Sequence, residues 1–413
     1  MGFRNFNLDP RLMKAVQEAN YTIPTPIQKE AIPVCMEGTD IIGTAATGTG
    51  KTAAFVLPIL HHLLRSHSHG KHTRVLIVAP TRELAEQNRE VIKLLSRHTH
   101  IKSAVVYGGV GFHAQEQALK DGTEIIVCCP GRLLDHMGQG NVNLKHVEIA
   151  VLDEADRMLD MGFLPDIRRI LAALPKERQT MLFSATFAPE LVDLINHNLR
   201  NPKRISVNTE APAETIDHCF YPVPESQKTD LLIALLKTIT DHKSILVFTR
   251  TKRRADEVMD RLKQAGFVTG ILHADRSQHE RKRELDNFRS GKLKIMVATD
   301  IAARGLDIQD ISHVINYDIP DTAVNYIHRI GRTGRAERSG DAITFISADD
   351  EDEVREIETR LGTQVEKKRL EGFEYKKYDV PTGRKFLQGA GGGHIYKGPM
   401  CGSWGGKKRG RRR

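Results

Sequence analysis

Three carboxylates stand within four positions at residues 153–156, directly after the apolar run of residues 149–152. An unpaired carboxylate is costly to bury, so such groups usually lie at the mouth of a strand, where they hold a cation or a proton. Asp153 is therefore a candidate ligand of Mg²⁺, and Glu154 is a candidate for polarising an attacking water molecule. A helix cap after the strand would explain one carboxylate but not all three, and Asp156 is interpreted as a structural or relay group.

A segment rich in glycine and threonine is a candidate phosphate site. It reads Ala45, Ala46, Thr47, Gly48, Thr49, Gly50, Lys51 and Thr52. Backbone N–H groups of a tight loop, backed by the N-terminus of a helix, bind phosphate, and glycine lets the backbone approach the anion closely. Lys51 would reach the β- and γ-phosphates of ATP, and the Thr52 hydroxyl would bind Mg²⁺. The strict pattern has glycine in place of Ala45, so an ordinary Gly/Thr loop is the alternative, but the acidic strand end favours a nucleotide site.

Residues 328–335 place three arginines and a histidine among glycines, in the order His-Arg-Ile-Gly-Arg-Thr-Gly-Arg. An arginine that donates to a γ-phosphoryl oxygen stabilises the charge of the transition state, and if it comes from another domain, hydrolysis depends on domain closure. An Arg/Gly run is also typical of a solvated loop. The phosphate and metal residues of the first half favour the catalytic interpretation.

Short apolar runs alternate with longer amphipathic stretches between residues 30 and 350, which predicts α/β domains. Near-continuous apolar strands that alternate with helices are typical of parallel sheets covered by helices on both faces. A polar, proline-bearing segment without periodicity at residues 207–217 indicates a linker between two such domains. The predicted strands are residues 40–42, 75–79, 104–107, 124–128, 149–152 and 180–183 in the first half, and 245–249, 269–272, 295–298, 313–316 and 341–346 in the second.

The length of the chain indicates the number of domains, and the distribution of its charge indicates a basic tail. Its 413 residues suit two domains with additional segments. The net charge of +9 is concentrated in residues 371–413, which hold eleven Lys or Arg and three Asp or Glu. Residues 389–413 contain nine glycines and cannot form a core, so we expect a disordered tail that interacts with a polyanion. No stretch approaches the roughly 20 apolar residues of a membrane span, and the N-terminus has no apolar secretory core, which favours a cytoplasmic protein.

With these motifs in this order, the chain resembles the DEAD-box family of ATP-dependent RNA helicases. The family is named after the sequence Asp-Glu-Ala-Asp, which stands here at residues 153–156. The order and spacing of the motifs match across roughly residues 1–350, so a chance match of the whole set is negligible. The further motifs are Pro-Thr-Pro-Ile-Gln at 24–28, Pro-Thr-Arg-Glu-Leu-Ala at 80–85, Gly-Gly at 108–109, Pro-Gly-Arg at 130–132, Ser-Ala-Thr at 184–186, Val-Phe-Thr-Arg at 247–250, Ala-Thr-Asp at 298–300 and Ala-Arg-Gly-Leu-Asp at 303–307.

The resemblance implies two RecA-like domains, each a mainly parallel sheet covered by helices on both faces, with ATP and Mg²⁺ in the cleft and RNA across both. The N-terminal ATP-binding domain, with its adenine-reading Q motif, would span residues 1–207, the linker 208–217, the C-terminal helicase domain 218–370 and the basic tail 371–413. The chain would be an RNA-dependent ATPase that locally separates short RNA duplexes. An ATP-gated RNA clamp without productive unwinding and a DNA helicase are the alternatives.

The resemblance also implies roles for particular residues. Gln28 and Tyr21 would contact adenine, with Phe3 as a second aromatic ring, and Asp307 would hold the ribose. Arg332 and Arg335 would face the γ-phosphate. Ser184 and Thr186 would couple the state of ATP to RNA binding, together with Asp156 and His328. The expected contacts with the RNA backbone are Thr81, Arg82, Gly109, Gly131 and Arg132 in the first domain and Arg250, Asp275, Gln278 and Thr299 in the second.

Three positions depart from the family pattern. Asn20 and Ala274 replace glycines, and Cys129 stands where a threonine normally donates to RNA phosphate, so that contact is in question. None of these changes touches the hydrolytic groups, so we expect an active ATPase. The short basic tail resembles bacterial members of the family, which act in ribosome assembly, RNA decay and cold adaptation. The expected partners are therefore structured RNA, ribosomal precursors and RNA-decay proteins, with a monomeric core.

Overall fold

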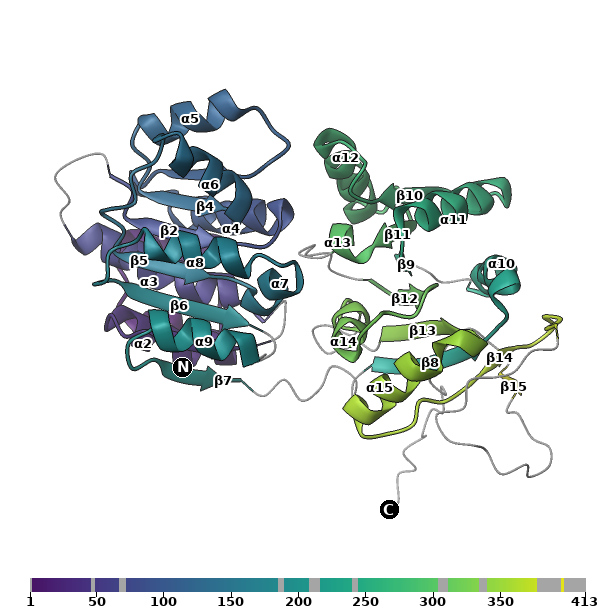
Figure 1. Ribbon diagram of the computed structural model, residues 1–413. Coiled ribbons are helices and arrows are strands. Elements are labelled where there is room, and N and C mark those ends of the chain that lie inside the picture. The colour runs from purple at the N-terminus through teal and green to yellow at the C-terminus, as the bar shows by residue number, and fades with distance from the viewer. Residues whose placement is uncertain are drawn as a thin grey trace, which may run out of the picture. The chain divides into compact units, whose positions relative to one another are not determined.

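The computed structural model describes residues 2–45, 49–66, 72–184, 189–207, 216–239, 244–303, 311–333, 340–376 and 395–396. These residues form two compact units, which divide between residues 209 and 210. Each unit is built on its own sheet and is described separately below (Figure 1).

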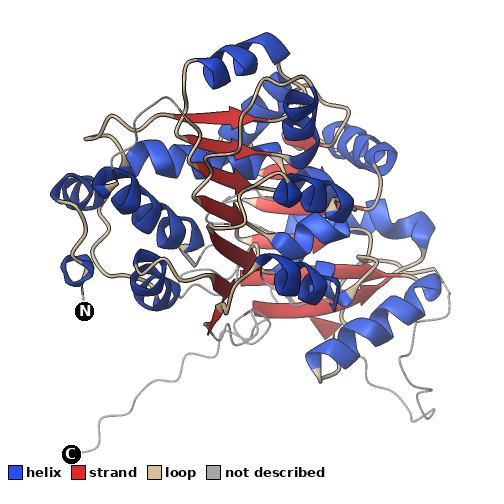
Figure 2. Cartoon of the chain, turned by 60° about the vertical axis from the view of Figure 1, so that its left-hand side comes forward, coloured by secondary structure: helices blue, strands red, loops and turns tan. Residues whose placement is uncertain are grey.

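The first unit contains a seven-stranded sheet in the order β3-β4-β2-β5-β6-β1-β7, and all its paired strands are parallel. Helices lie on both of its faces (Figure 2). The strands are β1 (Ile41–Thr44), β2 (Val75–Val78), β3 (Ser103–Val106), β4 (Ile125–Cys128), β5 (Ile149–Leu152), β6 (Gln179–Ser184) and β7 (Lys203–Ser206). The helices are η1 (Phe3–Phe6), α1 (Pro10–Glu18), α2 (Pro26–Met36), α3 (Lys51–Arg65), α4 (Arg82–Leu95), α5 (Phe112–Lys120), α6 (Pro130–Gly138), α7 (Ala155–Asp160), α8 (Leu164–Ala172) and α9 (Pro189–Asn198).

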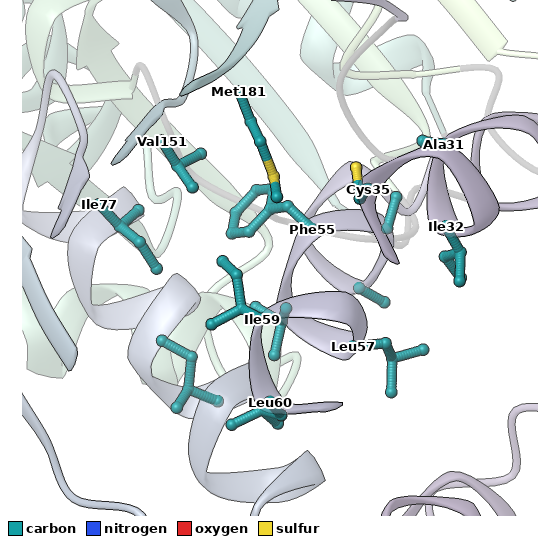
Figure 3. Packing of buried hydrophobic residues seen from close by; sticks show 14 of the residues in the cluster. Ala31, Ile32, Cys35, Phe55, Leu57, Ile59, Leu60, Ile77, Val151 and Met181 are labelled. Carbon is teal, nitrogen blue, oxygen red and sulfur yellow. The ribbon is translucent and has the colours of Figure 1, made fainter. Parts of the chain in front are cut away.

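The two faces of this sheet bury separate hydrophobic clusters, because successive strand residues point to opposite faces. Ile77 and Val151 belong to the cluster covered by η1 and α1–α4, whereas their neighbours Leu76 and Leu152 belong to the cluster covered by α6–α9. Figure 3 shows the first cluster, in which Phe55 of α3 lies near Met181 of β6. Burial on both faces explains why these strands are continuous apolar runs in the sequence.

The second unit contains a six-stranded parallel sheet in the order β10-β11-β9-β12-β13-β8. Its strands are β8 (Ile216–Pro222), β9 (Ile245–Thr249), β10 (Thr269–Leu272), β11 (Ile295–Thr299), β12 (His313–Asn316) and β13 (Gly340–Ile346), and a separate small sheet joins β14 (Arg369–Leu370) to β15 (Ile395–Tyr396). The helices are η3 (Glu225–Gln227), α10 (Lys228–Thr238), α11 (Lys252–Gln264), α12 (Gln278–Arg289), α13 (Asp300–Ala303), α14 (Ala323–Ile330), η4 (Ala348–Asp350) and α15 (Glu351–Leu361).

Both faces of the second sheet are also covered. Val247 and Ile315 pack with α10 and α11 in one hydrophobic cluster. On the other face, Phe220 of β8 makes an edge-to-face contact with Tyr326 of α14, at 6.2 Å between ring centroids. The predicted α/β fold with two mainly parallel sheets is therefore confirmed, and each of the eleven predicted strands overlaps an observed one.

Two edge strands and the start of the tail differ from the predictions. β7 buries only Ile205 among exposed polar residues, and β8 begins at Ile216, inside the segment that we predicted as a linker. β7 resembles a loop in sequence because it buries a single residue, whereas β8 carries the polar residues Asp217 and His218 before its buried run of Cys219, Phe220 and Tyr221. The predicted tail begins too early, because residues 371–376 pack on the second unit: the Gln227 amide donates to the Glu374 carbonyl (2.9 Å) and accepts from the Lys376 N–H (2.8 Å). The predicted disorder of the later tail falls largely outside the described residues.

No helix among the described residues is both long enough and apolar enough to cross a membrane.

A buried histidine fastens the N-terminal helix to the first unit. The backbone N–H of Asp9, the residue that caps α1, donates to Nδ1 of His61 on α3 at 3.0 Å. Because Nδ1 accepts this bond, the ring has to be neutral. Burial lowers the pKa of His61, and the neighbouring charges of Arg65 and His62 lower it further, whereas Asp9 raises it.

We therefore predict that acid weakens the first unit through His61. Its pKa is lower in the folded chain than the ordinary value of about 6.5, so the unfolded chain binds the proton more readily and stability falls as the pH drops below that value. Asparagine at this position supplies an acceptor oxygen that does not titrate. Between pH 7.5 and pH 5, the melting temperature of His61→Asn should fall less than that of the unsubstituted protein, and equal losses would contradict the role of His61.

Candidate nucleotide site and nucleic-acid interface

The predicted phosphate loop lies between β1 and α3, where a strand leads into the N-terminus of a 15-residue helix. Lys51 is the first residue of α3 and is only 7% exposed. Its ammonium group donates to the Ala45 carbonyl at 2.9 Å, so the lysine is directed toward the end of β1. Ala46, Thr47 and Gly48 lie outside the described residues.

Gln28 of the predicted adenine site is fastened to this loop. Its amide oxygen accepts from the Thr25 N–H at 3.0 Å, and its amide nitrogen donates to the Gly50 carbonyl at 3.1 Å. One donor hydrogen and one lone pair of the amide remain for a base edge. Gly50 has a φ of +86°, and a Cβ atom there would lie 2.5 Å from the Gln28 amide nitrogen. Tyr21 lies beside Phe3, with 6.0 Å between ring centroids.

The acidic cluster follows β5, at the same edge of the sheet as the phosphate loop. Asp153 is 2% exposed, and its N–H donates to the Val78 carbonyl at 2.9 Å. Burial raises the pKa of Asp153 to about 6, and the Glu154 charge also raises it, whereas the Lys51 ammonium group lowers it. Among the described residues, no lysine or arginine forms an ion pair with Asp153. A buried carboxylate of this kind fits a cation site.

Asn88 of α4 connects the two predicted metal ligands, and sequence analysis missed it. The Thr52 hydroxyl donates to Oδ1 of Asn88 at 3.2 Å, and Nδ2 of Asn88 donates to the Asp153 carboxylate at 3.0 Å. The Asn88 side chain is fully buried. A polar residue on the buried face of an otherwise amphipathic helix was the signal that could have indicated it.

Glu154 is held by a second residue that sequence analysis missed. The carboxylate forms an ion pair with Arg157 one turn along α7, and both residues are 4% exposed. Glu154 has a φ of +53°, an unusual left-handed conformation for a residue other than glycine. Such conformations persist where the surrounding structure enforces them, and they are common at functional sites. The carboxylate is therefore fixed in direction and already engaged by a cation.

Asp156 and Ser184, which we predicted to couple ATP to RNA, lie together. The backbone N–H of Asp156 donates to the Ser184 hydroxyl at 3.3 Å. The Ser184 carbonyl accepts from the Ala45 N–H at 3.2 Å, so Ser184 also contacts the start of the phosphate loop. Both side chains are buried. Thr186 lies outside the described residues.

The predicted RNA contacts of the first unit gather at the ends of β2, β3 and β4. A Cβ atom on Gly109, whose φ is +81°, would overlap the guanidinium group of Arg82, so the arginine rests directly on this glycine. Arg132 donates to the Val110 carbonyl at 3.2 Å. The Thr81 hydroxyl caps α4 by accepting from the Leu84 N–H.

Two residues complete this cluster at the N-terminus of α6. Gly131 is exposed, with no atom within 4 Å of a Cβ position, so its backbone is open to a ligand. Cys129 precedes the helix without a side-chain capping bond. Burial raises the pKa of the Cys129 thiol to about 12, so the thiol is neutral at physiological pH.

The predicted RNA contacts of the second unit follow β9, β10 and β11. Arg250 is exposed and forms ion pairs with Asp321 (3.0 Å) and Glu353 (3.7 Å). Asp275 pairs with Lys252 at 2.7 Å, and this lysine holds the pKa of the carboxyl below its usual value. Gln278 begins α12, and its buried Oε1 finds no hydrogen-bond partner among the described residues. Thr299, at the end of β11, is 8% exposed.

Arg329 and Arg332, in the segment at residues 328–335, have different surroundings in the structure. Arg329 is 3% exposed, makes two bonds of 2.6 Å to the Asp300 carboxylate and lies over the Phe248 ring. It therefore has a structural role. Arg332 follows the end of α14 and is also buried, whereas His328 is half-buried on that helix.

The remaining predicted site residues are Arg335 and Asp307, which lie outside the described residues.

Comparisons with known proteins identify the class. The profile of the DEAD/DEAH box helicases matches residues 25–194, and that of the helicase conserved C-terminal domain matches residues 227–337. The ATP-dependent RNA helicase CshA of Listeria monocytogenes is 43% identical over 378 residues, covering 91% of this chain and 71% of the relative. RhpA of Helicobacter pylori, a DEAD-box ATP-dependent RNA helicase, is 40% identical over 365 residues, covering 88% and 73%.

Solved structures agree with this class. Saccharomyces cerevisiae Dbp5 bound to RNA and ADP BeF3 has a TM-score of 0.78 at 33% identity and covers 89% of this chain and 95% of its own. Mss116p bound to ssRNA and AMP-PNP has a TM-score of 0.80 at 29% identity, covering 89% and 78%. The chain thus belongs to the DEAD-box family. It is an ATP-dependent RNA helicase, and its enzymatic activity is RNA-dependent ATP hydrolysis.

The contact between Gly50 and Gln28 generates a prediction. Alanine at Gly50 or at Gly38 would force a side chain into a left-handed conformation, at a cost of roughly 1–2 kcal/mol. Only Gly50→Ala would displace the Gln28 amide, because nothing lies within 4 Å of a Cβ position at Gly38. Both variants should melt at a lower temperature, and only Gly50→Ala should weaken binding of fluorescent ADP, by roughly tenfold for one lost hydrogen bond. Equal affinities would refute the link between base recognition and the loop.

Proposed function

We propose that this helicase locally separates short RNA duplexes by closing its two units on the RNA backbone when ATP binds. One observation carries this proposal: the predicted ATP residues and RNA residues of the first unit follow strands of one parallel sheet at the same edge. Ligands of open α/β sheets bind at the carboxyl ends of the strands. The carboxyl ends of the strands in this one sheet can therefore bind both ATP and RNA.

Mg²⁺ fits the predicted metal ligands. The Thr52 hydroxyl donates its hydrogen to Asn88, so its lone pairs stay available, and the buried Asp153 carboxylate has no ion-pair partner among the described residues. Hydroxyl and carboxylate oxygens are the ligands that Mg²⁺ prefers. The ion would neutralise charge on the β- and γ-phosphates when bound.

Hydrolysis would then rest on four groups of this chain. Lys51 would exchange the Ala45 carbonyl for phosphate oxygens, and Glu154 would orient and polarise the attacking water molecule. Arg332 and Arg335 would stabilise the charge on the γ-phosphoryl group once closure brings them from the second unit. Dbp5 and Mss116p, which are similar to this chain in fold, are bound to RNA together with ADP BeF3 or AMP-PNP in their solved structures. These complexes support joint binding of nucleotide and RNA.

RNA would be held through its backbone. Arg82, Gly109, Gly131 and Arg132 offer guanidinium and backbone N–H groups, which bind phosphates without reading base sequence. Closure would join this half-site to that of the second unit and favour a bent single strand, pulling one strand from a short duplex. Loss of phosphate would reopen the units and release the RNA.

Glu154→Gln tests the hydrolytic assignment. The amide keeps the size of the side chain but cannot act as a base, so RNA-stimulated ATP hydrolysis should fall by roughly a hundredfold or more. ATP-dependent binding of single-stranded RNA should persist. The matched control is Glu148→Gln, which stands at the other end of β5 and pairs with Arg74. Undiminished turnover in Glu154→Gln would remove that residue from the mechanism.

Strand displacement decides between unwinding and clamping. A short tailed RNA duplex incubated with ATP and the full chain should release its strand catalytically. Stable binding without release would identify an ATP-gated clamp and overturn the unwinding proposal. Equal displacement of a matched DNA duplex would contradict a preference for RNA.

The basic tail is a separable part of the proposal. Residues 377–413 carry ten Lys or Arg and one Asp. Each phosphate that they neutralise releases counterions, so their contribution to RNA affinity should fall with salt. Truncation after Lys376, which keeps the residues packed on the second unit, should weaken RNA binding and flatten its salt dependence, while ATP hydrolysis without RNA is unchanged. Equal salt slopes for the two proteins would refute this role.

We further propose that the protein acts as a monomer in the cytoplasm on structured RNA, including ribosomal precursors, and with RNA-decay proteins. The identity to bacterial helicases such as CshA supports this setting.

A further inference from the structure

Asn88 is a buried polar residue in the interior of α4 to which the proposed mechanism gives no direct contact with ATP or RNA. Its side chain is fully buried. Asparagine is a weak helix former because its side chain competes for backbone hydrogen bonds, and an unsatisfied amide is costly in a core. Here both ends of the amide are satisfied, one by Thr52 and the other by Asp153. A buried polar link of this kind fixes the geometry of its partners.

The directions of these two bonds favour a cation. The Thr52 hydroxyl donates to Asn88 at 3.2 Å, which turns its lone pairs away from the amide. Nδ2 of Asn88 donates to one oxygen of Asp153 at 3.0 Å, and the Glu154 backbone N–H also donates to this carboxylate. A carboxylate has about four lone-pair sites, so the two bonds hold its orientation and leave acceptor sites for a cation. Groups behind metal ligands that fix their orientation in this way change metal affinity by roughly 10–100-fold when they are removed.

The same helix begins at the predicted RNA contacts. Thr81 caps α4 and Arg82 is its first residue. A helix rises about 1.5 Å per residue, so Asn88 lies roughly 9 Å along the axis from Arg82. Arg82 rests on Gly109, and the Tyr107 hydroxyl donates to Glu86 between these two positions. The helix therefore joins the RNA contacts to the metal ligands as one rigid element.

We propose that Asn88 is a positioning residue that orients Thr52 and Asp153 toward a divalent cation, and that α4 couples this orientation to RNA at Thr81 and Arg82. The inference rests on the proposed function, since it assumes that Thr52 and Asp153 hold Mg²⁺. RNA that fixes the N-terminus of α4 also fixes the Asn88 amide, fewer than two turns away. By linkage, a bound cation then strengthens RNA binding.

Asn88→Leu in the full chain tests the positioning role, because leucine is of similar size and keeps the site filled. The Mg²⁺ concentration that gives half-maximal binding of fluorescent ADP should rise on the order of tenfold. Binding in the presence of a chelator should be unchanged. The matched control is Gln179→Leu, which removes another buried amide with two bonds, to the carbonyls of Cys35 and Thr39. That variant should lose thermal stability without a change in Mg²⁺ dependence.

The coupling is measured as the gain in affinity for single-stranded oligouridylate RNA when Mg²⁺ and a non-hydrolysable ATP analogue are added. This gain should be several-fold smaller in Asn88→Leu than in the unsubstituted protein. If Asn88→Leu does not fold, Asn88→Ser, which is too short to reach both partners, is measured instead. A folded variant with an unchanged Mg²⁺ requirement or an unchanged gain would overturn the inference. An unsubstituted protein without Mg²⁺-dependent nucleotide binding would contradict the proposed function itself.

Discussion

The parallel direction of the strands is the constraint on which the rest of the structure depends. In each sheet the carboxyl ends of the strands meet at one edge, so every loop that follows a strand lies there. In the first unit this brings Ala45, Thr81, Asp153 and Ser184 to one edge, although they are far apart in the sequence. The buried Asn88 then fixes Thr52 and Asp153 relative to each other. The helices pack on the two apolar faces of the sheet, and this packing holds the strands and their carboxyl ends in position.

Apolar periodicity was enough to predict the central strands, because they are buried on both faces and have no polar alternation. It was not enough for β7, which buries one residue at the edge of its sheet, or for β8, whose exposed Asp217 continues the polar segment before it. The acidic and phosphate motifs could be predicted from residue types and spacing. Asn88 and Arg157 could not, because their importance depends on partners that only the fold brings within reach.

Residue type alone also did not show which arginine of the second unit has a structural role and which is a candidate for catalysis. Arg329 and Arg332 stand three positions apart and look equivalent in the sequence. Arg329 is enclosed by Asp300 and the Phe248 ring, and breaking such a buried pair leaves an uncompensated charge. Arg329 is therefore already engaged within the second unit, which leaves Arg332 as the described arginine of this segment for which we propose the catalytic role.

The ion pair between Glu154 and Arg157 extends the constrained segment one position beyond the four residues after which the family is named. Both side chains are buried, and removing one partner of a buried ion pair is strongly destabilising. A mutation at Arg157 would therefore affect the stability of the first unit and the orientation of the Glu154 carboxylate together. Natural selection would act on both properties at once at this position, so it has less freedom to vary than an exposed helix residue.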